Sequence, residues 1–91
     1  MSMRTIQITV AGKVQGVWFR KYTKEKAEVL GLNGSVENLA DGSVFIIAQG
    51  EESALDEFIK WTSIGSPESR VDNTAIEELD EDLSEPFHIK Y

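Results

Sequence analysis

The sequence predicts an α+β sandwich of the ferredoxin-like type: βαββαβ order, two helices on one face of a mostly antiparallel sheet, and a short extra C-terminal strand. Two observations predict it. Apolar residues alternate with period two in several segments and recur with helical spacing in two others, and glycine-containing turns separate these segments. The 91 residues match the size of one domain, so we expect residues 1–91 to form a single domain.

The first strand is predicted over residues 4–12, where β-branched apolar residues alternate with polar ones. A loop with two glycines follows at residues 12–16. Apolar residues then recur at helical spacing over residues 19–30, which predicts the first helix. Gly31 stands where a glycine commonly ends a helix, because it adopts a positive φ without a Cβ penalty.

A hairpin is predicted next, with strands at about residues 34–38 and 43–49. The turn at 39–42 contains Asp-Gly, a strong hairpin signal. Two glutamates at 51–52 begin the second helix, since negative charge suits the positive end of the helix dipole. A Gly-Ser-Pro sequence at 65–67 ends this helix.

The last part of the chain predicts two further strands. The alternation over residues 70–76 is imperfect, so we expect a bulge in that strand. Residues 77–85 are mostly acidic and are expected to form a connector. Residues 86–91 predict the short final strand, in which His88 points outward.

The composition excludes several classes of function. Nine basic and sixteen acidic residues give a net charge of −7, which disfavours nucleic acid as a partner. There is no cysteine and one histidine, so disulfides, thiolate zinc sites, cysteine nucleophiles and histidine-based metal clusters are disfavoured, and no metal is expected. No 18-residue apolar run exists to span a membrane, and no signal-peptide block precedes the first strand. The expected location is the cytoplasm, without a membrane partner.

The charge is unevenly distributed along the chain. Residues 1–30 contain six basic and two acidic residues, whereas residues 31–91 contain three basic and fourteen acidic residues. A surface that attracts an anion is therefore expected within the first thirty residues.

The loop between the first strand and the first helix, residues 12–20, is the candidate site. Its glycines allow several backbone N–H groups to converge on one phosphate, and the helix N-terminus adds further donors. Arg20 can bind two phosphate oxygens through its planar guanidinium. The residues alone leave an alternative open, namely an ordinary connection with turn glycines and a solvated Arg20.

The loop also carries a motif that resembles the signature of the acylphosphatase family, Val10-x-Gly12-x-Val14-Gln15-Gly16-Val17-x-Phe19-Arg20. Further matching residues are Ala27, Leu30-Gly31-Leu32, Gly34, Val36, Asn38, Asp41-Gly42-Ser43-Val44 and Gly50, with weaker matches at Gly65-Ser66-Pro67, Val71 and Phe87-x-Ile89. The resemblance covers nearly the whole chain.

The resemblance implies the hydrolysis of acyl phosphates to a carboxylate and inorganic phosphate, without metal or organic cofactor. It implies two catalytic residues, Arg20 on the phosphate and Asn38 orienting the attacking water. The implied phosphate-binding loop consists of Gln15, Gly16, Val17, Trp18, Phe19 and Arg20. This chemistry agrees with the composition, because an acyl phosphate has a good leaving group and requires mainly positioning and charge stabilisation.

Two residues depart from the family pattern. Ser35 stands where an aromatic residue is common, and Glu37 stands where a basic or neutral residue is usual. In a strand both lie on the face opposite Asn38. We expect weaker local packing from Ser35 and weaker anion attraction from Glu37.

Two other functions compete with this interpretation. A non-enzymatic anion- or small-molecule-sensing module would use the same loop but would not need the amide of Asn38. An RNA-binding sheet is disfavoured because the first strand presents Thr5, Gln7 and Thr9 where stacking aromatics would be required. No oligomerisation signal is present, so a monomer is expected.

Overall fold

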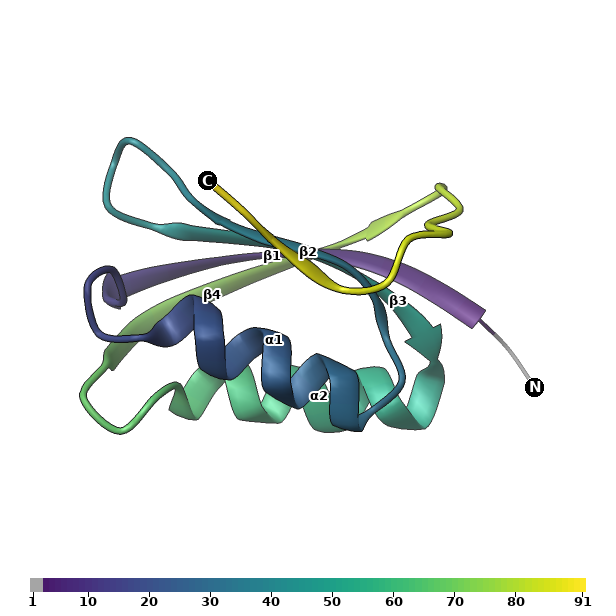
Figure 1. Ribbon diagram of the computed structural model, residues 1–91, viewed down its shortest axis with the longest axis horizontal. Coiled ribbons are helices and arrows are strands. Elements are labelled where there is room, and N and C mark those ends of the chain that lie inside the picture. The colour runs from purple at the N-terminus through teal and green to yellow at the C-terminus, as the bar shows by residue number, and fades with distance from the viewer. Residues whose placement is uncertain (1–2) are drawn as a thin grey trace.

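The computed structural model describes residues 3–91, so residues 1 and 2 of the predicted domain lie outside the described part of the chain. The elements are β1 (Met3–Lys13), α1 (Phe19–Val29), β2 (Asn33–Asn38), β3 (Val44–Glu51), α2 (Glu52–Ile64), β4 (Arg70–Leu79) and β5 (His88–Lys90). The strands form one sheet in the order β4-β1-β3-β2-β5, and both helices cover the same face of it (Figure 1). The predicted ferredoxin-like fold is confirmed.

The strand pairing brings distant parts of the chain together. β1 is antiparallel to both β3 and β4, β2 is antiparallel to β3, and β5 is parallel to β2 at the sheet edge. The expected bulge lies in β4, because Ala11 pairs with Asn73 and Gly12 with Val71, which leaves Asp72 without a partner in the register.

The core lies between the sheet and the helices. Alternate residues of β1, β2 and β3 point toward the helices, and the helices contribute aromatic and aliphatic side chains. The apolar side chains buried without any exposed surface include Ile6, Ile8, Val10, Ala27, Val36, Val44, Ile46, Ala48, Leu55 and Phe58. The Trp61 ring packs against Phe19, with 5.6 Å between ring centroids, and against Phe58. This packing holds the start of α1 against α2.

β4 is longer than its sequence pattern predicts. The acidic residues Glu77 and Glu78 continue the strand and pair with β1, although they were expected in a connector. Glu78 accepts a hydrogen bond from Arg4 Nε at 2.8 Å. β4 is an exposed edge strand, so its solvent-facing positions tolerate charge and the apolar alternation is lost. Among the described residues, no helix is long and apolar enough to cross a membrane.

Ser35 lies beneath a cavity on the sheet face away from the helices. The cavity has a volume of about 280 Å³ and lies between Ser35, Ile47 and the segment 81–85. Ser35 is buried, and the next residue, Val36, faces the core on the opposite side of the sheet. The space above Ser35 agrees with the weaker packing expected from this small residue.

Filling this cavity should stabilise the protein. We expect Ser35→Phe to raise the free energy of unfolding by about 1 kcal/mol, because the ring would bury apolar surface against Ile47 and the 81–85 segment. Urea denaturation would measure the change. The same substitution at Ser53, which is exposed on α2, is the control and should change stability by less than about 0.5 kcal/mol. A Ser35→Phe protein no more stable than the parent would contradict the prediction.

Candidate active site

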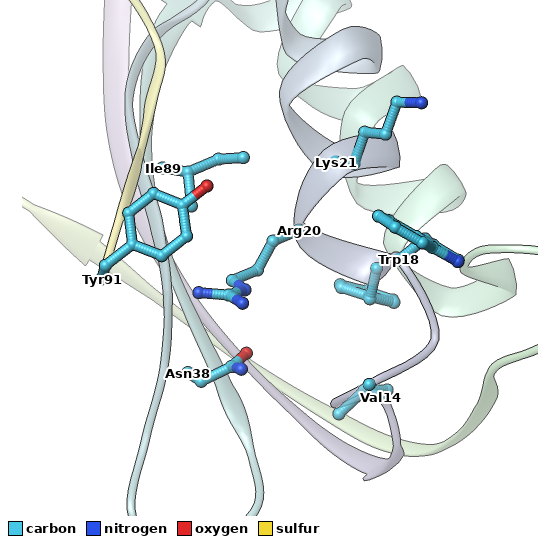
Figure 2. Close-up of a pocket in the computed structure, with 9 residues that line it drawn as sticks. Val14, Trp18, Arg20, Lys21, Asn38, Ile89 and Tyr91 are labelled. Atoms are coloured by element: carbon cyan, nitrogen blue, oxygen red, sulfur yellow. The ribbon is translucent and has the colours of Figure 1, made fainter.

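A second, larger cavity opens at the end of the sheet where the β1–α1 loop approaches β2 and β5. Its volume is about 360 Å³. Four elements of the fold contribute to its walls, and Figure 2 shows the side chains around it. The lining residues are Val14, Gly16, Trp18, Phe19, Arg20, Lys21, Asn38, Ile89 and Tyr91. Both predicted catalytic residues, Arg20 and Asn38, therefore line one cavity.

The β1–α1 loop is curled by two residues with left-handed backbone conformation. Gly16 has φ 75° and Trp18 has φ 64°, which is rare for a bulky side chain and is typical of functional sites. The first backbone hydrogen bond of α1 runs from Tyr22 N–H to the Trp18 carbonyl at 3.1 Å. Within the described residues, the N–H groups of residues 15–20 have no acceptor. Such a loop of uncommitted donors at a helix N-terminus can bind an anion.

Side chains outside the cavity hold this loop in place. Ser66, in the α2–β4 connection, donates a hydrogen bond from Oγ to the Val17 carbonyl at 2.9 Å. Gln15 Nε2 donates to the carbonyls of Leu39 and Ser43 at 2.8 and 2.9 Å. The side chain of Gln15 and the carbonyl of Val17 thus anchor the loop, and neither residue lines the cavity.

The anchoring role of Ser66 was not predicted from the sequence. Its only signal was the weak match of Gly65-Ser66-Pro67 to the family pattern. Sequence reasoning also missed the C-terminal wall of the cavity, which Ile89 and Tyr91 supply. Neither residue has a functional group or a spacing in the sequence that would have identified it as part of the site.

Arg20 projects from the first turn of α1 into the cavity. Its guanidinium carbon lies 5.0 Å from the ring centroid of Tyr91, and Figure 2 shows the group directed at the space between Tyr91 and Asn38. In residues 3–91 no carboxylate pairs with Arg20 or Lys21, whereas Arg4 contacts two glutamates. None of the lining residues is acidic, so the cavity has a positive electrostatic character.

Asn38 is the last residue of β2, and its carboxamide faces the cavity opposite the helix (Figure 2). Its Oδ1 atom is buried and has no hydrogen-bond partner among the described residues. An unsatisfied buried polar atom costs free energy, and such atoms mark places where a ligand or water is bound. Glu37 does not line the cavity, in agreement with its expected place on the other face.

The turn after Asn38 is shaped by Asp41. The carboxylate accepts hydrogen bonds from Ser43 Oγ at 2.6 Å and from Ser43 N–H at 3.0 Å. These two hydrogen bonds hold the pKa of the Asp41 carboxyl below its ordinary value. The turn is therefore ordered by a charged carboxylate.

Acid should loosen this turn. Because the pKa of Asp41 is lowered in the folded protein, its contribution to stability is present above the ordinary aspartate value of about 4 and is lost as the pH falls through the lowered pKa. NMR titration should show the Ser43 amide resonance shifting together with the Asp41 carboxyl below pH ~4. Asp41→Asn should remove that titration, and a Ser43 resonance that still shifts there would contradict the assignment.

The geometry defines a class of protein. The described residues form a small ferredoxin-like domain in which a loop of unpaired backbone N–H groups, an arginine without a carboxylate partner and a buried carboxamide surround one cavity. Within residues 3–91 there is no cluster of three or more His, Cys, Asp or Glu side chains able to hold a metal ion. His88 lies away from this cavity, with Nδ1 3.0 Å from the Pro86 carbonyl oxygen.

Comparison with known proteins identifies the family. The acylphosphatase family model matches residues 6–89. The acylphosphatase of Thermotoga petrophila is 45% identical over 89 residues, which are 98% of this chain and 99% of the relative. The crystal structure of the Bacillus subtilis acylphosphatase has a TM-score of 0.93 at 36% identity, covering 99% of this chain and 100% of that one. The Coxiella burnetii acylphosphatase structure also has a TM-score of 0.93, at 38% identity, covering 97% and 93%. The chain belongs to the acylphosphatase family, whose members are hydrolases of acyl phosphates.

Proposed function

We propose that the chain hydrolyses acyl phosphates to a carboxylate and inorganic phosphate by direct attack of water, without a metal ion. In this proposal the backbone N–H groups of residues 15–20 and the guanidinium of Arg20 bind the phosphate group. Asn38 orients the water. The cavity volume of about 360 Å³ is sufficient for a small acyl phosphate.

The binding step follows from the donors around the cavity. Oxygens of the phosphate group accept hydrogen bonds from the loop N–H groups, which have no other acceptor in the described residues. The Arg20 guanidinium adds a charge-assisted pair of hydrogen bonds to two of these oxygens. The lining contains no acidic side chain that would oppose this attraction from the wall of the cavity.

The chemical step requires one positioned water molecule. The Asn38 carboxamide can accept a hydrogen bond from the water through Oδ1 while its NH₂ group contacts a phosphate oxygen. The water oxygen attacks phosphorus, the bond from phosphorus to the acyl oxygen breaks, and the carboxylate leaves with the electron pair. A phosphate oxygen takes the proton of the water. Arg20 and the loop stabilise the charge on the phosphoryl oxygens in the transition state.

One observation favours an enzyme over an anion-sensing module. The buried, unpartnered Oδ1 of Asn38 lies on the same cavity as Arg20. A sensor would require the loop and the arginine, but it would gain nothing from an unsatisfied amide oxygen that costs stability.

Activity should be tested on two substrates with excess chelator present. We expect rapid hydrolysis of an aromatic acyl phosphate and no hydrolysis of a simple phosphate monoester, with the same rate before and after chelation. Full inactivity, or activity restored only by a metal ion, would refute the proposed mechanism.

Inorganic phosphate provides a test that does not depend on turnover. It should stabilise the fold by about 2.7 kcal/mol at a hundred times its dissociation constant, because it binds only the folded protein. Thermal denaturation at increasing phosphate concentration would measure this. In activity assays it should also inhibit competitively. The monomeric state and cytoplasmic location stay predictions from the sequence, and analytical ultracentrifugation would test the first of them.

A further inference from the structure

The side chain of Gln15 joins the phosphate loop to the turn that follows Asn38. Its single NH₂ group donates to two carbonyl oxygens, those of Leu39 at 2.8 Å and Ser43 at 2.9 Å. These carbonyls also close the turn itself, because Leu39 N–H donates to Ser43 and Gly42 N–H donates to Leu39. Gln15 therefore binds the base of the β2–β3 turn, immediately beside Asn38 in the chain.

Strand pairing does not make this connection. β1, which leads into the loop, and β2, which ends at Asn38, are separated in the sheet by β3. Among the hydrogen bonds of residues 3–91, only the two from Gln15 link the loop to the end of β2 or its turn. The main proposed phosphate ligands belong to the loop and α1, whereas Asn38, which is proposed to orient the water, belongs to β2.

We infer that Gln15 is a positioning residue, which holds Asn38 at the correct distance from the phosphate bound by the loop. The inference rests on the proposed function. It assigns the Gln15 side chain no contact with phosphate, although its backbone N–H belongs to the loop. Misplacing a reacting group by about 1 Å can reduce a rate by about 10²-fold, so two lost hydrogen bonds at this position have a measurable consequence.

The test compares Gln15→Met with a matched variant. Methionine keeps the length of the side chain and removes both donors. We expect kcat to fall about 10–100-fold, while the dissociation constant of inorganic phosphate changes less than about threefold, because the loop N–H groups and Arg20 remain. Gln15→Leu, which is also neutral and loses both donors, serves as the second variant if Gln15→Met does not fold.

Gln49→Met is the control. Gln49 also uses its carboxamide for several contacts, donating to Thr5 Oγ1 at 3.0 Å and accepting from Leu83 N–H at 3.0 Å, but it does not line the cavity. Gln49→Met should lower the melting temperature by as much as Gln15→Met does, or by more, and leave kcat and KM unchanged. An equal loss of kcat in Gln49→Met would show that Gln15 acts only through general stability.

A double variant tests whether Gln15 affects catalysis by positioning Asn38 or independently of it. If Gln15 acts through Asn38, then Gln15→Met should reduce kcat little further in an Asn38→Ala background. A full additional loss, or a parallel loss of phosphate affinity in the single variant, would overturn the inference.

One readout does not require activity. The side-chain NH₂ resonances of Asn38 should shift or broaden in Gln15→Met and stay unchanged in Gln49→Met. Unchanged resonances in Gln15→Met would overturn the inference even if the parent protein proved inactive, whereas inactivity of the parent alone would refute only the proposed function.

Discussion

Replacing Arg20 with alanine should lower kcat/KM for an acyl phosphate by about 10³-fold, the largest effect that we expect of any single substitution. The guanidinium is the charged side chain directed at the space beside Asn38, and no carboxylate among the described residues competes for it. Its loss removes a contact with a charged ligand that contributes about 1.5–3 kcal/mol to binding. The affinity for inorganic phosphate should therefore fall about 10–100-fold.

Two companion measurements make this result specific. Arg20→Lys keeps the charge but not the planar fork, so it should recover part of the phosphate affinity and little of kcat. Lys21→Ala, on the cavity rim, should weaken binding only slightly and in a salt-dependent way. If Arg20→Ala retained stabilisation by phosphate, the anion would bind elsewhere and the proposed site would be wrong.

Replacing Asn38 with alanine should lower kcat by about 10²–10³-fold and leave phosphate binding nearly unchanged. The amide is proposed mainly to orient water, whereas most of the phosphate contacts come from the loop and Arg20 on the other side of the cavity. The variant should not be strongly destabilised, because the buried Oδ1 atom makes no hydrogen bond in the described residues. Steady-state kinetics together with phosphate titration would measure the two effects.

Asn33 provides the matched control for Asn38, since it lies in the same strand. Its Nδ2 atom donates to the Leu83 carbonyl at 3.0 Å, at the other end of β2 from the cavity. Asn33→Ala should reduce stability and leave kcat unaffected. A kcat for Asn38→Ala within threefold of the parent would exclude the water-orienting role.

Most of the fold could be predicted from the sequence because the buried faces have regular periods. Apolar residues alternate in β1 and recur with helical spacing after Phe19, because one face of each element is buried in the same core. β4 could not be bounded correctly. Its last residues, Glu77 to Leu79, pair with β1 at an exposed edge, where no apolar face is required and where Arg4 offsets the charge of Glu78.

The candidate site could be predicted only in part. The residue types at Arg20 and Asn38 carry recognisable chemistry, and the fold brings them to one cavity. The direction of the Gln15 side chain could not be derived, because it depends on where the β2–β3 turn lies in space. The contact of Ser66 with Val17 likewise joins segments that only tertiary structure brings together.

The order of strands in the sheet has a consequence for folding kinetics. β1 lies between β3 and β4, so Thr5 pairs with Gln49 on one side and with Leu79 on the other. These pairings close long loops of chain, and folding dominated by such contacts is slow, on the order of milliseconds to seconds. During synthesis from the N-terminus, the β1–α1 loop leaves the ribosome well before β4 is available to flank β1. Until β4 is made, β1 keeps an unpaired edge that could associate with other nascent chains.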